Sequence, residues 1–251
     1  MSGTGAGLRG AAAIVGVADA VSPTGELEGS LRAIEAAVIR EALDDAGLTL
    51  ADVDGVCSNL SAGWAPSMEL AEYLGIAPRW TDTTQTGGSS FEIHVEHAAA
   101  AIALGLCEVV IVVYAATPRS SFKRGGPGFG SRQATPGPTP GAEFELPYGM
   151  RMPMGAYALA ASRHMAEFGT TSEQLAQIAV DTRRWATMNP RARLQDPITV
   201  EDVLASPFEA SPLHKLDCCL VTDGPGCVVL TSAERARTPR KPPVPVRGTA
   251  T

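Results

Sequence analysis

The sequence predicts an α/β fold, in which a sheet is layered with helices. Two observations support this prediction. Short apolar runs typical of buried strands alternate with stretches whose apolar residues recur at helical spacing. The stretch Arg79–Tyr114 also has the pattern of a strand, a tight glycine turn, a buried helix and a second strand. This alternation of strands and helices predicts a mostly parallel sheet.

The elements before that stretch follow the same alternation. Apolar residues at helical spacing begin at Leu31, and Gly47 is a natural helix end. A first strand is expected at Ala11–Val17, a second at Val53–Cys57 and a short helix at Met68–Leu74.

Within Arg79–Tyr114, the turn between strand and helix is the most informative feature. Thr81–Thr86 suits a strand, Gly87 and Gly88 permit a sharp turn, and Ser89 or Ser90 is expected to cap a helix that ends at Gly105. Many α/β enzymes present a nucleophile at such a turn, where the helix N-terminus stabilises negative charge. This turn has no cysteine, and an ordinary strand–helix–strand unit explains the pattern equally well.

The chain changes character after Tyr114. Residues 117–149 are rich in Gly and Pro, which indicates either a functional or mobile loop or a flexible linker. Helices are predicted from Met154 to Gly169 and from a Thr171–Gln174 capping box to Thr187, with a shorter one opened by Thr199 and Asp202. Strands are expected at Leu213–Cys219, Gly226–Ser232 and Pro242–Arg247, with a short helix at Ser232–Arg237.

The bulk properties exclude several classes of protein. A formal net charge of −7 without a basic stripe argues against a nucleic-acid partner. No apolar run is long enough to cross a membrane, and the N-terminus lacks the apolar core of a signal peptide. The five cysteines form no CxxC pair, so we expect reduced thiols in a cytoplasmic protein.

Three linked segments occur in order in the second half of the chain: FGTTSEQLAQIAVDTRRWATMNPRA (168–192), DPITVEDVLASPFEASPLHKLDCC (196–219) and VTDGPGCVVLTSAERAR (221–237). Together they resemble the thiolase superfamily, specifically the sterol-carrier-protein-x type and its lipid-transfer relatives. The resemblance implies a thiolase-like layered α-β-α sandwich, the first of two duplicated halves, with an inserted helical loop domain. It implies an N-terminal α/β domain at 1–116 and 206–238, a substrate-side loop domain at 117–205, and the start of a truncated C-terminal half at 239–251.

The resemblance also assigns a role to the glycine turn. Active thiolases carry their nucleophilic cysteine at this position, which aligns with Gly88 or, one residue off, with Gly87. The segment QTGGSSFEIHVEHAA resembles actinobacterial lipid-transfer-type proteins. Some of these proteins are retro-aldolases that act on steroid side-chain CoA thioesters together with a small OB-fold/zinc-ribbon partner. Their proposed catalytic tyrosines lie beyond Thr251. The backbone N–H groups of Gly87, Gly88 and Ser89 are therefore the candidate catalytic groups, as donors to a thioester or enolate oxygen.

Other candidate residues have simpler alternatives. Tyr157, with Met152 and Met154, is expected to face the acyl group, unless these side chains are ordinary core. Arg183 and Arg184 are expected to bind CoA phosphates, although an exposed helix face explains them equally well. Asp223, Gly224 and Gly226 match the family's structural turn. His94 and His97 lie three residues apart, where a dimer-facing helix explains them better than a metal site.

The function expected from the resemblance is retro-aldol carbon–carbon cleavage of an acyl-CoA in steroid or lipid side-chain degradation. The alternatives are an acetyl-CoA acyltransferase, a non-catalytic acyl-CoA or lipid-binding module, and an inactive fragment. We expect acyl-CoA as substrate, no bound cofactor or metal, a homodimer, and the small OB-fold/zinc-ribbon protein as a further partner.

Overall fold

The computed structural model describes residues 8–59, 64–123, 140–150, 153–237 and 240–249. The chain forms two compact units. Unit 1 contains residues up to 21, 27–117 and 223 onward, and unit 2 contains residues 22–26 and 118–222. The boundaries predicted for an inserted loop domain, 117 and 205, stay a prediction.

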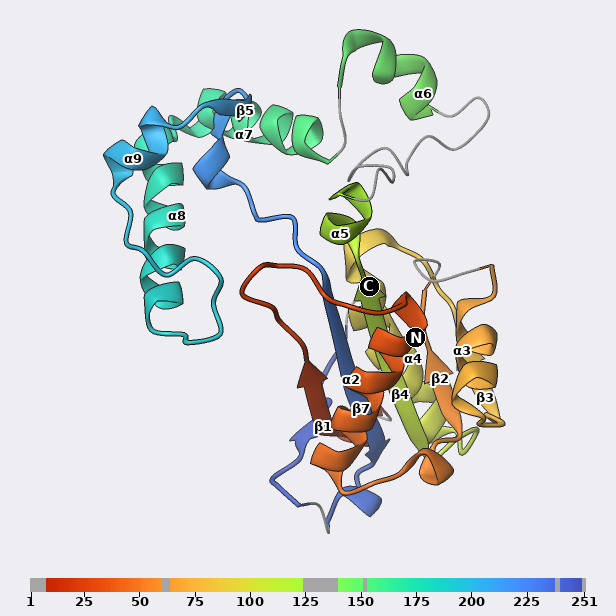
Figure 1. The fold of residues 1–251 in the computed structure, drawn as a ribbon. Coiled ribbons are helices and arrows are strands. Elements are labelled where there is room, and N and C mark those ends of the chain that lie inside the picture. Colours follow the sequence, from red (N-terminus) through yellow and green to blue (C-terminus); the bar gives the residue numbers. More distant parts are fainter. Residues whose placement is uncertain (1–7, 60–63, 124–139, 151–152, 238–239, 250–251) are drawn as a thin grey trace. The chain divides into compact units, whose positions relative to one another are not determined.

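Unit 1 is built on a six-stranded sheet in the order β3-β2-β4-β7-β1-β8 (Figure 1). Its strands are β1 (Ala12–Asp19), β2 (Gly55–Cys57), β3 (Trp80–Asp82), β4 (Val109–Ala116), β7 (Gly224–Ser232) and β8 (Val244–Pro245). β2 runs parallel to β3 and β4, whereas β7 runs antiparallel to both β4 and β1, and β8 runs antiparallel to β1. The prediction of a mostly parallel sheet was therefore wrong. β7 follows the long segment 117–223 rather than a single crossover helix, so the strand–helix–strand alternation that predicts a parallel neighbour does not extend to it.

Helices cover both faces of this sheet (Figure 1). On one face, α2 (Leu31–Ala46) and α3 (Pro66–Leu74) bury their apolar stripes against residues such as Ile111 and Val229. On the other, α4 (Ser90–Ala103) packs its small side chains, including Ala98 and Ala99, against Val110 and Leu230. β4 is thus buried on both faces, which explains its uninterrupted apolar run.

In unit 1 both ends of α2 follow the expected chemistry, whereas the end of β3 departs from it. Ser30 caps α2 by accepting from the Ala33 N–H, and Gly47 ends it with φ 71°. The strand predicted to reach Thr86 ends at Asp82. There the Asp82 carboxylate accepts hydrogen bonds from the Thr84 N–H and hydroxyl, and this local turn replaces strand pairing.

Unit 2 is mainly helical. Its elements are α5 (Pro118–Lys123), α6 (Pro140–Phe144), α7 (Met154–Phe168), α8 (Ser172–Thr187), α9 (Val200–Ala205), β5 (Phe208–Ala210) and β6 (Leu213–His214). The capping box predicted at Thr171 and Gln174 is present at the start of α8, and Thr199 and Asp202, predicted to open a short helix, form a second capping box at the start of α9. The strand predicted at Leu213–Cys219 was wrong beyond His214, because a 3₁₀ turn at Lys215–Asp217 closes on the Asp217 carboxylate.

Single-turn 3₁₀ helices account for the remaining regular elements, at Leu50–Asp52, Gly87–Ser89, Leu146–Tyr148 and Arg235–Arg237. The last of these replaces the short helix predicted at Ser232–Arg237. Within the described ranges, no helix is both long and apolar enough to cross a membrane.

Candidate functional site

The turn between β3 and α4 is a sharp elbow at the start of a helix. Gly87 has φ 79°, a conformation that residues with side chains rarely adopt, and the 3₁₀ turn Gly87–Ser89 leads directly into α4. A Cβ added at Gly88 would meet nothing within 4 Å, and Gly88 does not have a positive φ. The N–H groups of this first turn have no intrahelical acceptor, so the elbow exposes donors beside open space.

Ser90 holds the elbow in shape. Its hydroxyl donates to the Gly87 carbonyl at 2.7 Å and accepts from the Thr86 N–H at 3.0 Å, and the residue is fully buried. The expected capping by Ser89 does not occur, because its hydroxyl instead donates to the Thr86 carbonyl at 3.3 Å. The two serines thus hold the backbone of the turn, and within the described ranges neither caps the N–H groups of Gly87, Gly88 and Ser89.

His94 lies one turn further along α4 and is fully buried. Its Nε2 is 2.9 Å from the Thr84 carbonyl, which can only accept, so Nε2 carries the proton. Its Nδ1 is buried without a hydrogen-bond partner in the described part of the chain. Burial lowers the pKa of His94, although the Asp82 carboxylate opposes that effect. The imidazole is therefore neutral, and its hydrogen bond to Thr84 holds the segment that leads into the elbow.

Asp82 and His97 form a second contact of this kind, which sequence reasoning missed. Asp82 Oδ2 lies 2.6 Å from His97 Nδ1, while Oδ1 accepts both bonds from Thr84. Burial acts to raise the pKa of Asp82, but the hydrogen bonds from His97 and Thr84 outweigh it and lower that pKa. The sequence did contain a signal for this contact, because Asp82 ends a strand and His94 and His97 lie on the helix that follows. Among the described residues, no group of three or more His, Cys, Asp or Glu is placed to hold a metal ion.

None of the five cysteines is at the elbow. Cys57, Cys107 and Cys227 are buried in unit 1, and burial raises the pKa of each thiol, that of Cys107 to about 11. Such thiols are poor nucleophiles at neutral pH. Cys218 and Cys219 belong to unit 2, and both are free.

The predicted structural turn lies at the start of β7. Asp223 is buried, and its carboxylate accepts from the Leu27 N–H at 3.0 Å, so it ties the segment before α2 to β7. Gly224 and Gly226 lie within β7 and pair with Ala116 and Tyr114 of β4. Their assignment as a structural turn stays a prediction.

The predicted substrate-facing residues of unit 2 are scattered. Tyr157 is largely exposed on α7, and Met154, at the start of α7, has its sulfur 3.5 Å from Cys218 Sγ. Met152 lies outside the described residues. The structure instead shows a cavity of about 410 Å³ between α7 and α8. It is lined by Ala160, Ala161, His164, Met165, Thr170, Gln174, Leu175 and Ile178.

Of the two arginines predicted to bind phosphate, Arg184 is exposed on α8 and Arg183 is half-buried. Arg183 donates to the Asp196 carbonyl at 2.8 Å, so it stabilises the loop after α8. Arg184 lies in the last turn of α8, where its charge favours the helix dipole. Their predicted role stays a prediction.

Comparison with known proteins relates this architecture to two curated sequences. The chain is 37% identical over 250 residues to a steroid side-chain-cleaving aldolase of Thermomonospora curvata, covering 97% of this chain and 62% of that protein. It is 34% identical over 247 residues to the 17-hydroxy-3-oxo-4-pregnene-20-carboxyl-CoA lyase of Mycobacterium tuberculosis, covering 97% of this chain and 63% of that protein. The chain thus spans a little under two thirds of the length of these relatives. No family model matches it.

Solved structures agree with the sequence matches. The Ltp2-ChsH2(DUF35) aldolase superposes with a TM-score of 0.83 at 34% identity, over 96% of this chain and 60% of that one. A monomeric SCP2-thiolase-like protein type 1 from Mycobacterium smegmatis superposes with a TM-score of 0.64 at 18% identity, over 90% of this chain and 46% of that one, and this likeness concerns the fold alone. The observed mixed sheet with helices on both faces confirms the predicted thiolase-like α/β fold.

Proposed function

From the premise that this chain belongs to the thiolase superfamily, among its SCP2-thiolase-like lipid-transfer and aldolase members, we propose that it contributes to an acyl-CoA lyase. The proposed reaction is retro-aldol cleavage of a carbon–carbon bond in a steroid or lipid side chain. The observation that carries the proposal is an elbow that keeps uncapped N–H donors and open space but has no thiol. The names of the aldolase and lyase relatives support the reaction class.

The proposed chemistry needs a substrate with a hydroxyl on the carbon β to the thioester. A base removes the hydroxyl proton, the bond between the α and β carbons breaks, and its electron pair moves onto the thioester oxygen as an enolate. The β carbon leaves as a ketone or aldehyde, and the enolate then takes a proton to give a shortened acyl-CoA. The N–H groups of Gly87, Gly88 and Ser89 would stabilise the enolate oxygen, because fixed donors act where negative charge develops.

A thiolase-type acyltransferase needs a nucleophile that forms an acyl-enzyme. The elbow offers Gly87 and Gly88, which have no side chain, and Ser89, whose hydroxyl is engaged with Thr86. Retro-aldol cleavage needs no such nucleophile. The elbow therefore favours the lyase over the acyltransferase.

The cavity between α7 and α8 supports an apolar acyl group as substrate. Its volume of about 410 Å³ falls in the range of sites for small molecules, and five of its eight lining residues are apolar. His164 and Thr170 hydrogen-bond one another at 2.8 Å and provide a polar group in this lining. We propose that this cavity of unit 2 binds an apolar acyl group, whereas Tyr157 and Met154, which are not among its lining residues, stay predicted substrate contacts.

We also propose that the working enzyme is a homodimer that associates with a small OB-fold/zinc-ribbon protein. The support is that the solved relative is named as an assembly of Ltp2 with ChsH2(DUF35). Co-expression followed by size-exclusion chromatography with light scattering tests this proposal. A monomer that does not co-elute with such a protein would contradict it.

The reaction itself is tested with a steroid CoA thioester that carries a β-hydroxyl. We expect release of the ketone without added free CoA, and no labelled cysteine in the trapped protein. Cleavage that depends on free CoA would instead indicate an acyltransferase. Binding without turnover, in the presence of the partner, would indicate a non-catalytic acyl-CoA module.

A further inference from the structure

A tight turn at residues 22–26 in unit 2 gathers three cationic side chains. The turn closes with a hydrogen bond from the Gly25 N–H to the Ser22 carbonyl at 2.9 Å, and Gly25 has φ 75°. A Cβ added at Gly25 would lie 3.2 Å from Arg119 Cδ and 3.3 Å from Arg193 Cδ. The stems of these two arginines, one from α5 and one from the loop after α8, therefore converge on the same glycine.

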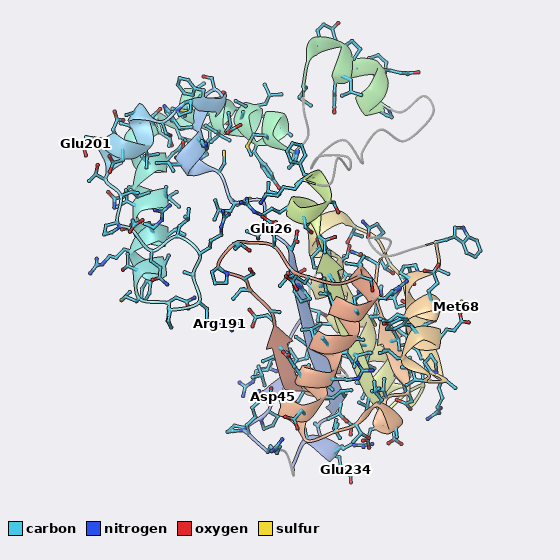
Figure 2. All side chains as sticks on the ribbon, viewed as in Figure 1. Glu26, Asp45, Met68, Arg191, Glu201 and Glu234 are labelled. Carbon is cyan, nitrogen blue, oxygen red and sulfur yellow. The ribbon has the colours of Figure 1, made fainter. Side chains whose placement is uncertain are left out.

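Glu26 joins this cluster to a third cation. Its Oε1 lies 3.2 Å from Arg119 Nε and 2.5 Å from Lys123 Nζ (Glu26 is labelled in Figure 2). The hydrogen bond with Lys123, followed by that with Arg119, lowers the pKa of Glu26, so its carboxylate is ionised at neutral pH. One carboxylate thus interacts with two cations at this turn.

Arg193 differs from Arg163 and Arg183, whose guanidinium groups are engaged within unit 2. It is partly exposed, and within the described ranges no carboxylate or carbonyl group binds its guanidinium. Arg183 is engaged by the Asp196 carbonyl, and Arg163 pairs with Glu167 at 2.7 Å. A stem fixed at Gly25 with an unoccupied guanidinium is well suited to bind an external anion.

We propose that Arg193, Arg119 and Lys123 bind the phosphate groups of the CoA moiety. This inference rests on the proposed function, because it takes an acyl-CoA thioester as the ligand. The chemistry matches, since a guanidinium forms two parallel hydrogen bonds to a phosphate and a lysine adds a point charge. It moves the phosphate site from Arg183 and Arg184, where the sequence pattern placed it, to the turn around Gly25.

The cluster is tested by isothermal titration calorimetry with two ligands, a steroid acyl-CoA and the matching S-acyl pantetheine, which has no phosphate anhydride or ribose phosphate. We expect the wild-type chain to bind the CoA thioester about tenfold or more tightly than the pantetheine thioester. R193A should remove most of that difference and leave binding of the pantetheine thioester unchanged. R163A removes the same charge from an exposed site on α7 and is the matched control, which should not change either affinity.

Glu26→Gln is the variant that separates ligand binding from a structural role. It removes the carboxylate that competes with a phosphate for Arg119 and Lys123, so we expect CoA-thioester binding to become several-fold tighter. A merely structural ion pair would give weaker or unchanged binding. This variant also carries the test if R193A does not fold, as judged by its thermal melt.

Three outcomes would overturn the inference. In the first, the wild-type chain binds both thioesters equally, which contradicts the phosphate site but leaves the proposed function standing. In the second, R184A abolishes the difference while R193A does not, which restores the site predicted from the sequence. In the third, the wild-type chain binds neither thioester, which contradicts the proposed function itself and this inference with it.

Discussion

The elbow makes a sharp prediction because its two adjacent glycines differ in backbone conformation. Gly87 has φ 79°, so a Gly87→Ala substitution forces a side chain into the left-handed region, at a cost of about 1–2 kcal/mol. Gly88 lacks a positive φ and faces open space, so Gly88→Ala costs almost nothing and removes backbone entropy from the unfolded chain. We expect G87A to lower the melting midpoint by roughly 2–8 °C and G88A to leave it within about 2 °C.

The same pair separates stability from catalysis. The methyl group of G88A enters the open space at the elbow, where we place the thioester of the substrate. We expect G88A to lose about 100-fold in ketone release while its melting curve stays near that of the wild type, a loss typical of a disabled oxyanion site. The assays are calorimetric melting and product release from a β-hydroxy steroid CoA thioester. Equal destabilisation by both variants would refute the backbone argument, and full activity of G88A would refute the proposed role of the elbow.

Three further predictions follow from the surroundings of the elbow. The lowered pKa of Asp82 means that its hydrogen bonds to His97 and Thr84 stabilise the fold above its ordinary pKa of 3.8, and that this stability is lost as the pH falls through the lower folded-state value. D82N should therefore lower the free energy of unfolding, measured with urea, by about 1–3 kcal/mol at pH 7 and by less at pH 3. A difference between D82N and the wild type that grows as the pH falls would contradict this assignment. Iodoacetamide at pH 8 should label the exposed Cys219 and leave Cys107 unmodified in the folded chain, as mass spectrometry can show; labelling of Cys107 first would contradict its burial. I111A, at the centre of β4, should cost about 2–5 kcal/mol, and a loss under 1 kcal/mol would mean that β4 is not a close-packed core strand.

Local chemistry in the sequence determined the elements and their ends. The capping boxes at Thr171 and Thr199, the helix ends at Gly47 and Gly169, and the apolar run of β4 depend on neighbouring residues, so they were predictable from spacing alone. The glycine turn was predictable for the same reason, because two adjacent glycines just before a helix permit the sharp backbone turn seen at Gly87. The family resemblance then supplied a fold and a reaction class.

Only the tertiary structure decided what is brought together from distant positions. β7 lies antiparallel between β1 and β4, although more than a hundred residues separate it from either strand in the sequence. The spacing of apolar residues within a strand does not determine in which direction that strand runs. The Asp82–His97 hydrogen bond joins the end of β3 to a side chain on the following helix α4. The convergence of Arg119 and Arg193 on Gly25 likewise joins three segments that are far apart in sequence. Such contacts follow from how the elements pack, whereas periodicity and capping report only on residues a few positions apart.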